Sequence, residues 1–374
     1  MPAAASRPDP IPHLTWDVFC HVVDNLGDIG VCWRFCADLA ARGQTVRLWV
    51  DEPGDLGWMV PGALEGHVVG VQVLHWTAPL APGLLANLPL SDVWIETFGC
   101  HPPPEALEHR ANAIAAGGRE PVWVNLEYMS AESYVERSHR LPSLVSFGPM
   151  RGVGKWFFYP GFTPATGGLL RENDLAARQS AFDSNAWLAS RGLPHTDRSR
   201  ASLFCYEPAA LPAVLQQSGD AACDWLVTAG RAGDAVANAL AQGLDTGLAA
   251  LHRLPRLTQR DYDHLLWSCD LNFVRGEDSL VRALWAGKPF VWHIYPQHDN
   301  AHHAKLDAFL DWLQAPASLR EMHHAWNGMA SPAKVWPGWA VVGDWTDCVM
   351  AARARLLTQP SLSEQLLEFV LEKR

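Results

Sequence analysis

The chain has 374 residues, of which 48% are hydrophobic and 18% are charged. This length and composition predict a globular protein of two or three domains whose cores need no disulfides or metals. A formal charge of -11, from 29 basic and 40 acidic residues, disfavours nucleic acid and anionic membrane surfaces as partners. No apolar run reaches the roughly 18 residues of a membrane-spanning helix.

The cysteines and the first residues indicate a location in the cytoplasm. None of the 8 cysteines forms a CxxC pair, and several lie in apolar runs where a thiol packs as a small hydrophobe. Residues 1–13 are rich in Pro and Ala and lack a basic segment leading into an apolar one, so we expect a loose tail and not a secretion signal.

The N-terminal half alternates predicted strands and helices. A strand over 15–23, a loop over 24–30, a helix that ends near Gly43 and a strand over 45–50 form the repeating unit of a parallel sheet. Apolar runs predict further strands at 68–74, 93–96 and 122–125, and a helix over 104–116.

The alternation resumes after a polar, helix-favouring stretch, which we interpret as an interdomain connection. The predicted strands are 202–206, 225–228, 271–274 and 290–294; the predicted helices are 261–268, 280–286 and a helical tail over 345–373. The fold class is therefore α/β, with two Rossmann-like domains facing each other across a crevice. The expected divisions are 14–168, the connection 169–192, 193–352, and a C-terminal helix 353–374 that packs back on the first domain.

Two carboxylates lie in the loop after the first strand, where an open parallel sheet places its ligand crevice. The segment 24–30 carries Asp24 and Asp28 but lacks the GxGxxG pattern of dinucleotide sites. Either aspartate could accept a proton as a general base, and the alternative is that they cap the helix and bind loop amides.

A second strand-to-helix junction carries Arg275, Asp278 and Ser279. Free amides and the helix dipole at such a junction bind phosphate, and they can do so without a metal. We expect Asp278 or Ser279 at the N-cap, and the alternative is that they only cap the helix.

Aromatic residues follow the first strand of the second half. Phe204 and Tyr206 could offer a flat surface to a nucleobase, with Gln259 bonding its edge; the alternative is that both rings belong to the core. The histidines His298, His302 and His303 lack partners at metal-ligand spacing, so we expect no metal there. Without a GxSxG elbow, a Walker loop or an HExxH helix, the layout favours a nucleotide-sugar glycosyltransferase.

Five segments then carry a resemblance to a known family: WDVFC at 16–20, VDNLGDIGVCWR at 23–34, NLEYMSAE at 125–132, KWFFYPGF at 155–162 and VRGEDS at 274–279. They resemble the protein-arginine rhamnosyltransferases of bacterial elongation factor P (the EarP family), from about Trp16 to the C-terminal helix.

The resemblance implies a GT-B enzyme that needs no metal or cofactor. It would move rhamnose from TDP-β-L-rhamnose, with inversion, to an arginine of elongation factor P, supporting translation of polyproline stretches. The family's catalytic carboxylates fall on Asp24, Asp28 and Glu277. The donor-binding positions would be Asn25, Gly27, Phe204, Tyr206, Gln259, Arg275, Asp278, Ser279 and Tyr295. One position departs from the family, because Arg256 stands where an aromatic would stack on the base.

The implied chemistry suits these residue types. A guanidinium is a poor nucleophile with a pKa above about 12, so carboxylates must orient it and accept its proton. We expect Asp28 to be the base and Asp24 to hold the loop or the guanidinium, although the reverse order is also open. Glu277 would position the sugar or the acceptor.

Three alternatives stay open. The same fold could serve a non-protein acceptor, such as a small molecule or a lipid-linked sugar. It could also belong to a nucleotide-sugar epimerase or hydrolase. Finally, the chain could be a non-catalytic nucleotide-binding or translation-associated protein, in which the carboxylates only cap loops.

Overall fold

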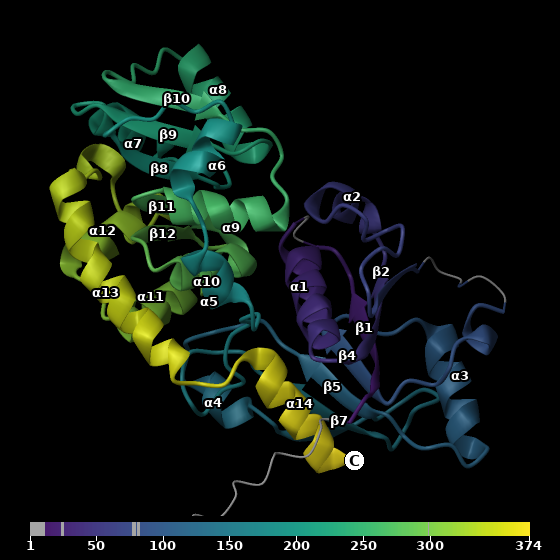
Figure 1. Ribbon diagram of the computed structural model, residues 1–374. Helices are drawn as coiled ribbons and strands as arrows, with labels where there is room; N and C mark the ends of the chain where they lie inside the picture. The colour runs from purple at the N-terminus through teal and green to yellow at the C-terminus, as the bar shows by residue number, and fades with distance from the viewer. Residues whose placement is uncertain (1–11, 24–25, 77–79, 81–82, 298) are drawn as a thin grey trace, which may run out of the picture.

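The computed structural model describes residues 12–23, 26–76, 80, 83–297 and 299–374. These residues form two α/β units side by side, each built on a mainly parallel sheet (Figure 1). This arrangement confirms the predicted fold class. Within the described residues, no helix combines the length and the apolar character needed to cross a membrane.

The first unit holds a seven-stranded sheet in the order β3-β2-β1-β4-β5-β7-β6, in which only β6 runs antiparallel, to β7. The central strands are buried on both faces, which explains their near-continuous apolar sequences. The strands are β1 (Thr15–Cys20), β2 (Thr45–Val50), β3 (Val71–His75), β4 (Val93–Thr97), β5 (Val122–Leu126), β6 (Pro142–Leu144) and β7 (Gly154–Phe158). The helices are α1 (Gly27–Ala41), α2 (Leu56–Met59), α3 (Pro104–Ala115) and α4 (Tyr134–Ser138), with 3-10 turns at Pro53–Asp55 and Leu85–Asn87.

The second unit holds a fully parallel five-stranded sheet in the order β10-β9-β8-β11-β12. Its strands are β8 (Ser199–Leu203), β9 (Cys223–Val227), β10 (Ala249–Arg253), β11 (Leu271–Arg275) and β12 (Phe290–His293). Its helices are α7 (Leu211–Ser218), α8 (Arg231–Ala241), α9 (Gln259–Ser268), α10 (Gly276–Ala286), α11 (Ala301–Leu313) and α12 (Ala317–Trp326), followed by a 3-10 turn at Pro332–Lys334.

The chain passes between the units twice. It first crosses through α5 (Leu175–Ser180) and α6 (Ser184–Ser190), and it returns from α13 (Trp339–Leu357) to α14 (Leu362–Lys373), which packs on α1 of the first unit (Figure 1). The tail was predicted as one helical stretch, but Pro360 separates two helices and Ser361 begins the second with a capping box. The division expected at 352/353 lies inside α13.

Two predicted strands run three residues past the observed carboxyl end, since β1 ends at 20 against 23 and β8 at 203 against 206. β1 ends at Cys20 and not at residue 23, because the Val22 amide bonds the Asp51 side chain at 2.9 Å and the Val23 amide bonds Asp28. β8 begins at Ser199 and ends at Leu203, where we expected 202–206, since its first two residues are polar yet pair with β9. Phe204 therefore follows the strand.

Tryptophans fill much of both cores. Trp16 and Trp49 in the first unit and Trp225 and Trp292 in the second are at most 1% exposed. The 8 cysteines, all described, are free, and all but Cys348 are buried.

Candidate active site

Two adjoining cavities lie between the units. The Phe204 cavity has a wall from the second unit that includes Phe204, Gln259, Tyr262 and Ser279, and a wall from the first unit that includes Trp58. The Asp28 cavity, of about 190 Å³, is lined by Asp28, Phe98, Tyr128, Glu277, Tyr295 and Lys305. Gly27, at the start of α1, lines both cavities. The two spaces therefore meet where α1 begins.

Asp28 lies in the first turn of α1 and is 3% exposed. One carboxylate oxygen accepts the Val23 amide at 2.9 Å, and the other accepts the Tyr128 hydroxyl at 3.3 Å. These contacts fix the carboxylate against the loop after β1 while it still lines its cavity. The other loop residues that we singled out, Asp24 and Asn25, lie outside the described residues.

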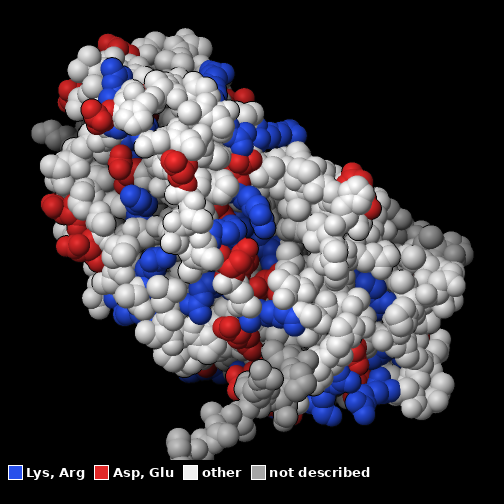
Figure 2. All heavy atoms as spheres, in the orientation of Figure 1, with Lys and Arg blue, Asp and Glu red and all other residues white. Residues whose placement is uncertain are grey.

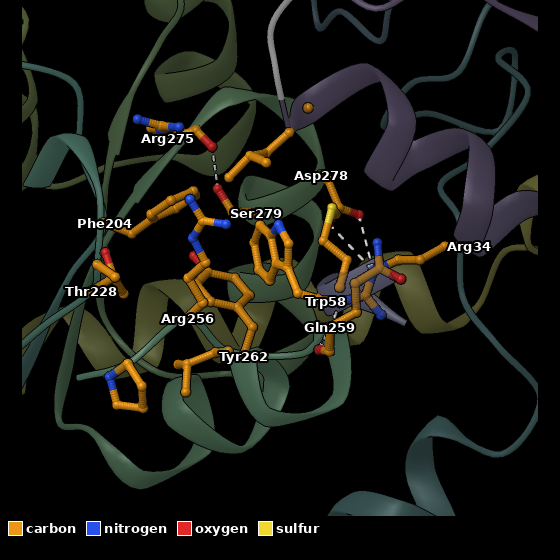
Figure 3. A pocket seen from close by; sticks show the side chains of 16 residues that line it. Arg34, Trp58, Phe204, Thr228, Arg256, Gln259, Tyr262, Arg275, Asp278 and Ser279 are labelled. Carbon is orange, nitrogen blue, oxygen red and sulfur yellow. Dashed lines mark hydrogen bonds and ion pairs between the residues drawn. The ribbon is translucent and has the colours of Figure 1, made fainter. Parts of the chain in front are cut away.

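The β11–α10 junction differs from the prediction in its cap. Arg275, and not Asp278 or Ser279, occupies the N-cap, and no described side chain caps the helix. The chain turns at Gly276 with φ +67°, a left-handed value that glycine adopts without strain, so the helix starts three residues before Ser279. The Ser279 hydroxyl instead donates to the Arg275 carbonyl (Figure 3).

Two consecutive carboxylates of α10 face different cavities. Glu277 lines the Asp28 cavity, where its oxygens accept the Met129 amide at 3.0 Å and pair with Lys305. Asp278 lines the Phe204 cavity and forms an ion pair of 3.3 Å with Arg34 of α1. Burial raises the pKa of both carboxyl groups, and the neighbouring cations oppose that rise.

Arg275 lies between two aromatic rings. Its guanidinium carbon is 4.5 Å from the Phe204 ring centre and 4.7 Å from that of Tyr206. Tyr206 itself lines neither of the two cavities; it is 2% exposed and meets Tyr295 edge-on at 5.7 Å. The structure thus brings Phe204 to the first cavity and Tyr295 to the second, with Tyr206 behind them as a support.

Gln259 joins the two units. The side-chain amide of Gln259 donates to the Gly30 carbonyl of α1 at 3.0 Å, and the backbone carbonyl of Gln259 accepts from Arg34 at 3.1 Å. A Cβ at Gly30 would come within 3.3 Å of that amide, so glycine permits the close approach of α1 to α9. Arg34 also pairs with Glu172 and Asp263, which makes it the centre of a buried charge network. Figure 3 shows its ion pair with Asp278.

Arg256 meets an aromatic ring from the other unit. Its guanidinium carbon is 5.4 Å from the ring centre of Trp58 in α2, and both line the Phe204 cavity. The aromatic surface that the sequence lacks at 256 is therefore present at Trp58.

Sequence reasoning did not single out several residues of the site, including Arg34, Tyr128, Trp58 and Lys305. Arg34 and Tyr128 lie inside the segments that carried the resemblance, which was the available signal for them. Trp58 and Lys305 carry no motif, and only the packing of α2 and α11 brings them to the cavities.

Basic and acidic side chains are interspersed on the face seen in Figure 2, including along the junction of the two units. Among the residues that the structure describes, no group of three or more His, Cys, Asp or Glu side chains is placed to hold a metal ion.

The comparison with protein families decides the assignment. The model of the family described as "Elongation-Factor P (EF-P) rhamnosyltransferase EarP" matches residues 16–371. The chain belongs to the EarP family. Two similar relatives are protein-arginine rhamnosyltransferases. That of Pseudomonas aeruginosa is 43% identical, and the match covers 87% of this chain and 90% of the relative. That of Pseudomonas putida is 40% identical, and the match covers 95% of this chain and 98% of the relative.

Solved structures agree with the EarP assignment. A structure reported for EarP-mediated arginine glycosylation of translation elongation factor EF-P is 29% identical, with a TM-score of 0.63, and the match covers 96% of this chain and all of that one. The glycosyltransferase SsfS6 of Streptomyces, complexed with thymidine diphosphate, is 13% identical, with a TM-score of 0.51, and the match covers 96% of this chain and 100% of that one. At this identity the likeness supports the fold alone.

Proposed function

We propose that this EarP-family chain transfers rhamnose from TDP-β-L-rhamnose to the guanidine group of an arginine in elongation factor P, with inversion at the anomeric carbon. In the cell the product would support translation of polyproline stretches. The arginine acceptor and the rhamnosyl group follow the names of the relatives. The nucleotide and the stereochemistry follow from the resemblance to the family, and the residue roles are argued from the site.

The Phe204 cavity suits the nucleotide of the donor. It combines the rings of Phe204 and Trp58, on which a base can stack, with the amide of Gln259, which can bond its edge. The uncapped first turn of α10 and Arg275 offer donors to a diphosphate. These donors compensate the charge of the leaving nucleotide, so the proposed reaction uses no metal.

The Asp28 cavity suits a guanidinium and the sugar. Two carboxylates, Asp28 and Glu277, line it, and carboxylates bind a guanidinium with matched geometry and charge. Asp28 accepts the proton that the guanidine nitrogen loses as it bonds to the anomeric carbon. Glu277 orients the acceptor or the sugar, and Asp24 would help to hold the loop or the guanidinium.

One observation carries the proposal: adjacent residues of one helix turn, Glu277 and Asp278, line the two different cavities. A donor bound along the first cavity therefore presents its sugar at the mouth of the second. Inversion requires the acceptor nitrogen to approach the anomeric carbon opposite to the nucleotide, and we propose that an acceptor held in the second cavity does so.

The test is intact-mass analysis of elongation factor P from the same organism after incubation with the enzyme and TDP-β-L-rhamnose, followed by peptide mapping. We expect a gain of one deoxyhexose on an arginine. Release of TDP without that gain would indicate hydrolysis or a non-protein acceptor. Absence of TDP binding would reject the donor assignment.

A further inference from the structure

Lys305 of α11 is joined to a carboxylate of the site. Its ammonium group pairs with one oxygen of Glu277, while the Met129 amide, at 3.0 Å, occupies the other. The two side chains are only 21% and 20% exposed, and both line the Asp28 cavity. Glu277 is thus held from both units of the protein, by α11 and by the segment after β5.

The same ammonium group lies near the residues that fix Asp28. It is 5.8 Å from the ring centre of Tyr128, whose hydroxyl bonds Asp28 at 3.3 Å and whose ring stacks on Phe98 at 4.4 Å. The other titratable side chains that line a cavity with Glu277 or interact with it electrostatically are Asp28 of α1, Tyr128, Tyr134 of α4, His302 of α11, and three residues of a neighbouring third cavity, Glu127, Asp278 and Arg282. Lys305 is the basic residue among these lining groups that contacts the carboxylate.

Two carboxylates in one part-buried cavity oppose each other's ionisation. Burial already raises the pKa of Glu277, Asp28 raises it further, and Lys305 lowers it. Burial lowers the pKa of His302, so that ring does not replace the ammonium charge near neutral pH. A protonated Glu277 would lose the charge that orients a guanidinium.

We propose that Lys305 is a positioning residue that keeps Glu277 ionised and oriented toward the acceptor side of the Asp28 cavity. This inference rests on the proposed function. Lys305 acts through Glu277, and its removal affects the turnover step more than donor binding.

The experiment measures rhamnosyl transfer by Lys305→Met and Lys305→Arg between pH 5.5 and 9, with TDP affinity from calorimetry as the test of an intact donor site. For Lys305→Met we expect the acidic limb of the pH profile of kcat to shift to higher pH by about one unit. At a given pH on that limb, kcat should fall about tenfold. Lys305→Arg should restore the wild-type limb, because it restores the cation, and TDP affinity should stay within about twofold in both variants.

Lys155→Met is the matched control. It removes another Lys–Glu pair, with Glu96 at 2.8 Å, whose members line neither cavity. It should keep the wild-type pH dependence. An unchanged acidic limb in Lys305→Met would overturn the inference, and so would a loss of TDP affinity, which would make Lys305 a diphosphate ligand. Should Lys305→Met not fold, Lys305→Gln carries the same test. A wild-type enzyme that transfers no sugar would instead reject the proposed function.

Discussion

Arg34 of α1 and Asp278 of α10 form a 3.3 Å ion pair across the crevice, joining residues 244 positions apart in the chain. The same guanidinium reaches Glu172, between the two units, and Asp263 of α9. A residue that we expect to bind the donor is therefore held by the opposite unit. We therefore expect donor binding and the arrangement of the two units to be coupled through this contact.

Arg34→Met should destabilise the fold. Arg34 is 5% exposed and pairs with the carboxylates of Glu172, Asp263 and Asp278. Without its positive charge these carboxylates repel one another, which lowers the free energy of unfolding by about 3 kcal/mol. Denaturant unfolding measures the change. The control is Arg320→Met, which breaks exposed pairs and should cost less than about 1 kcal/mol. Equal losses in the two variants would contradict the central position of Arg34.

Asp28→Asn should abolish transfer while TDP still binds. The amide keeps the shape of the side chain but cannot accept the proton, so we expect kcat to fall at least ~100-fold. The mass assay and calorimetry measure the two properties. Asp311→Asn, at a side chain that is 73% exposed, should be fully active. An active Asp28→Asn enzyme would remove Asp28 as the base.

Ser279→Ala should weaken donor binding. Ser279 lines the Phe204 cavity in the first turn of α10, and we expect its hydroxyl to turn from the Arg275 carbonyl to the diphosphate when the donor binds. Loss of that one hydrogen bond to a charged group weakens affinity about tenfold. Ser190→Ala is a matched control, because that hydroxyl also donates to a helix carbonyl but lies on α6, outside both cavities. Unchanged TDP affinity in calorimetry would reject the phosphate site at this position.

The buried charge network around Arg34 should make the free energy of unfolding depend on pH in the acidic range. Burial acts to raise the pKa of Asp263, but Arg282 and Arg34 outweigh it and lower the pKa to about 2. Because the folded value lies below the unfolded value of about 3.9, this carboxylate stabilises the fold above pH 4, and the contribution is lost between pH 4 and 2. The free energy of unfolding should fall over that range, and fall less steeply in Asp263→Asn. The same slope in both proteins would contradict the assignment.

The sequence predicted those features that depend on local patterns. The strand over 45–50 has the boundaries of β2, because a buried parallel strand is a short apolar run. The end of α1 near Gly43 was also predictable, since that residue has φ +83°. The cap of α10 was predicted wrongly, because the polar residues suited to capping come after the glycine at which the helix begins.

Contacts between the units could not be predicted in this way. Lys305 meets Glu277 through the packing of α11, and Trp58 meets Arg256 across the crevice, and neither pair has a local signature. Glu277 and Asp278 are consecutive in α10, so their side chains leave the helix about 100° apart, and only the packing of both units around that helix gives each its cavity.

The return of the chain from α13 to α14 has a consequence for dissecting the protein. Leu366, Phe369 and Val370 of α14 lie in the core of the first unit, although they follow the whole second unit in the chain. A fragment that stops after the first sheet would expose the apolar surface that they cover. The chain therefore crosses between the two units twice, and cutting it at one place cannot yield two complete units. A separately folding first unit would need α14 spliced to it or supplied as a peptide.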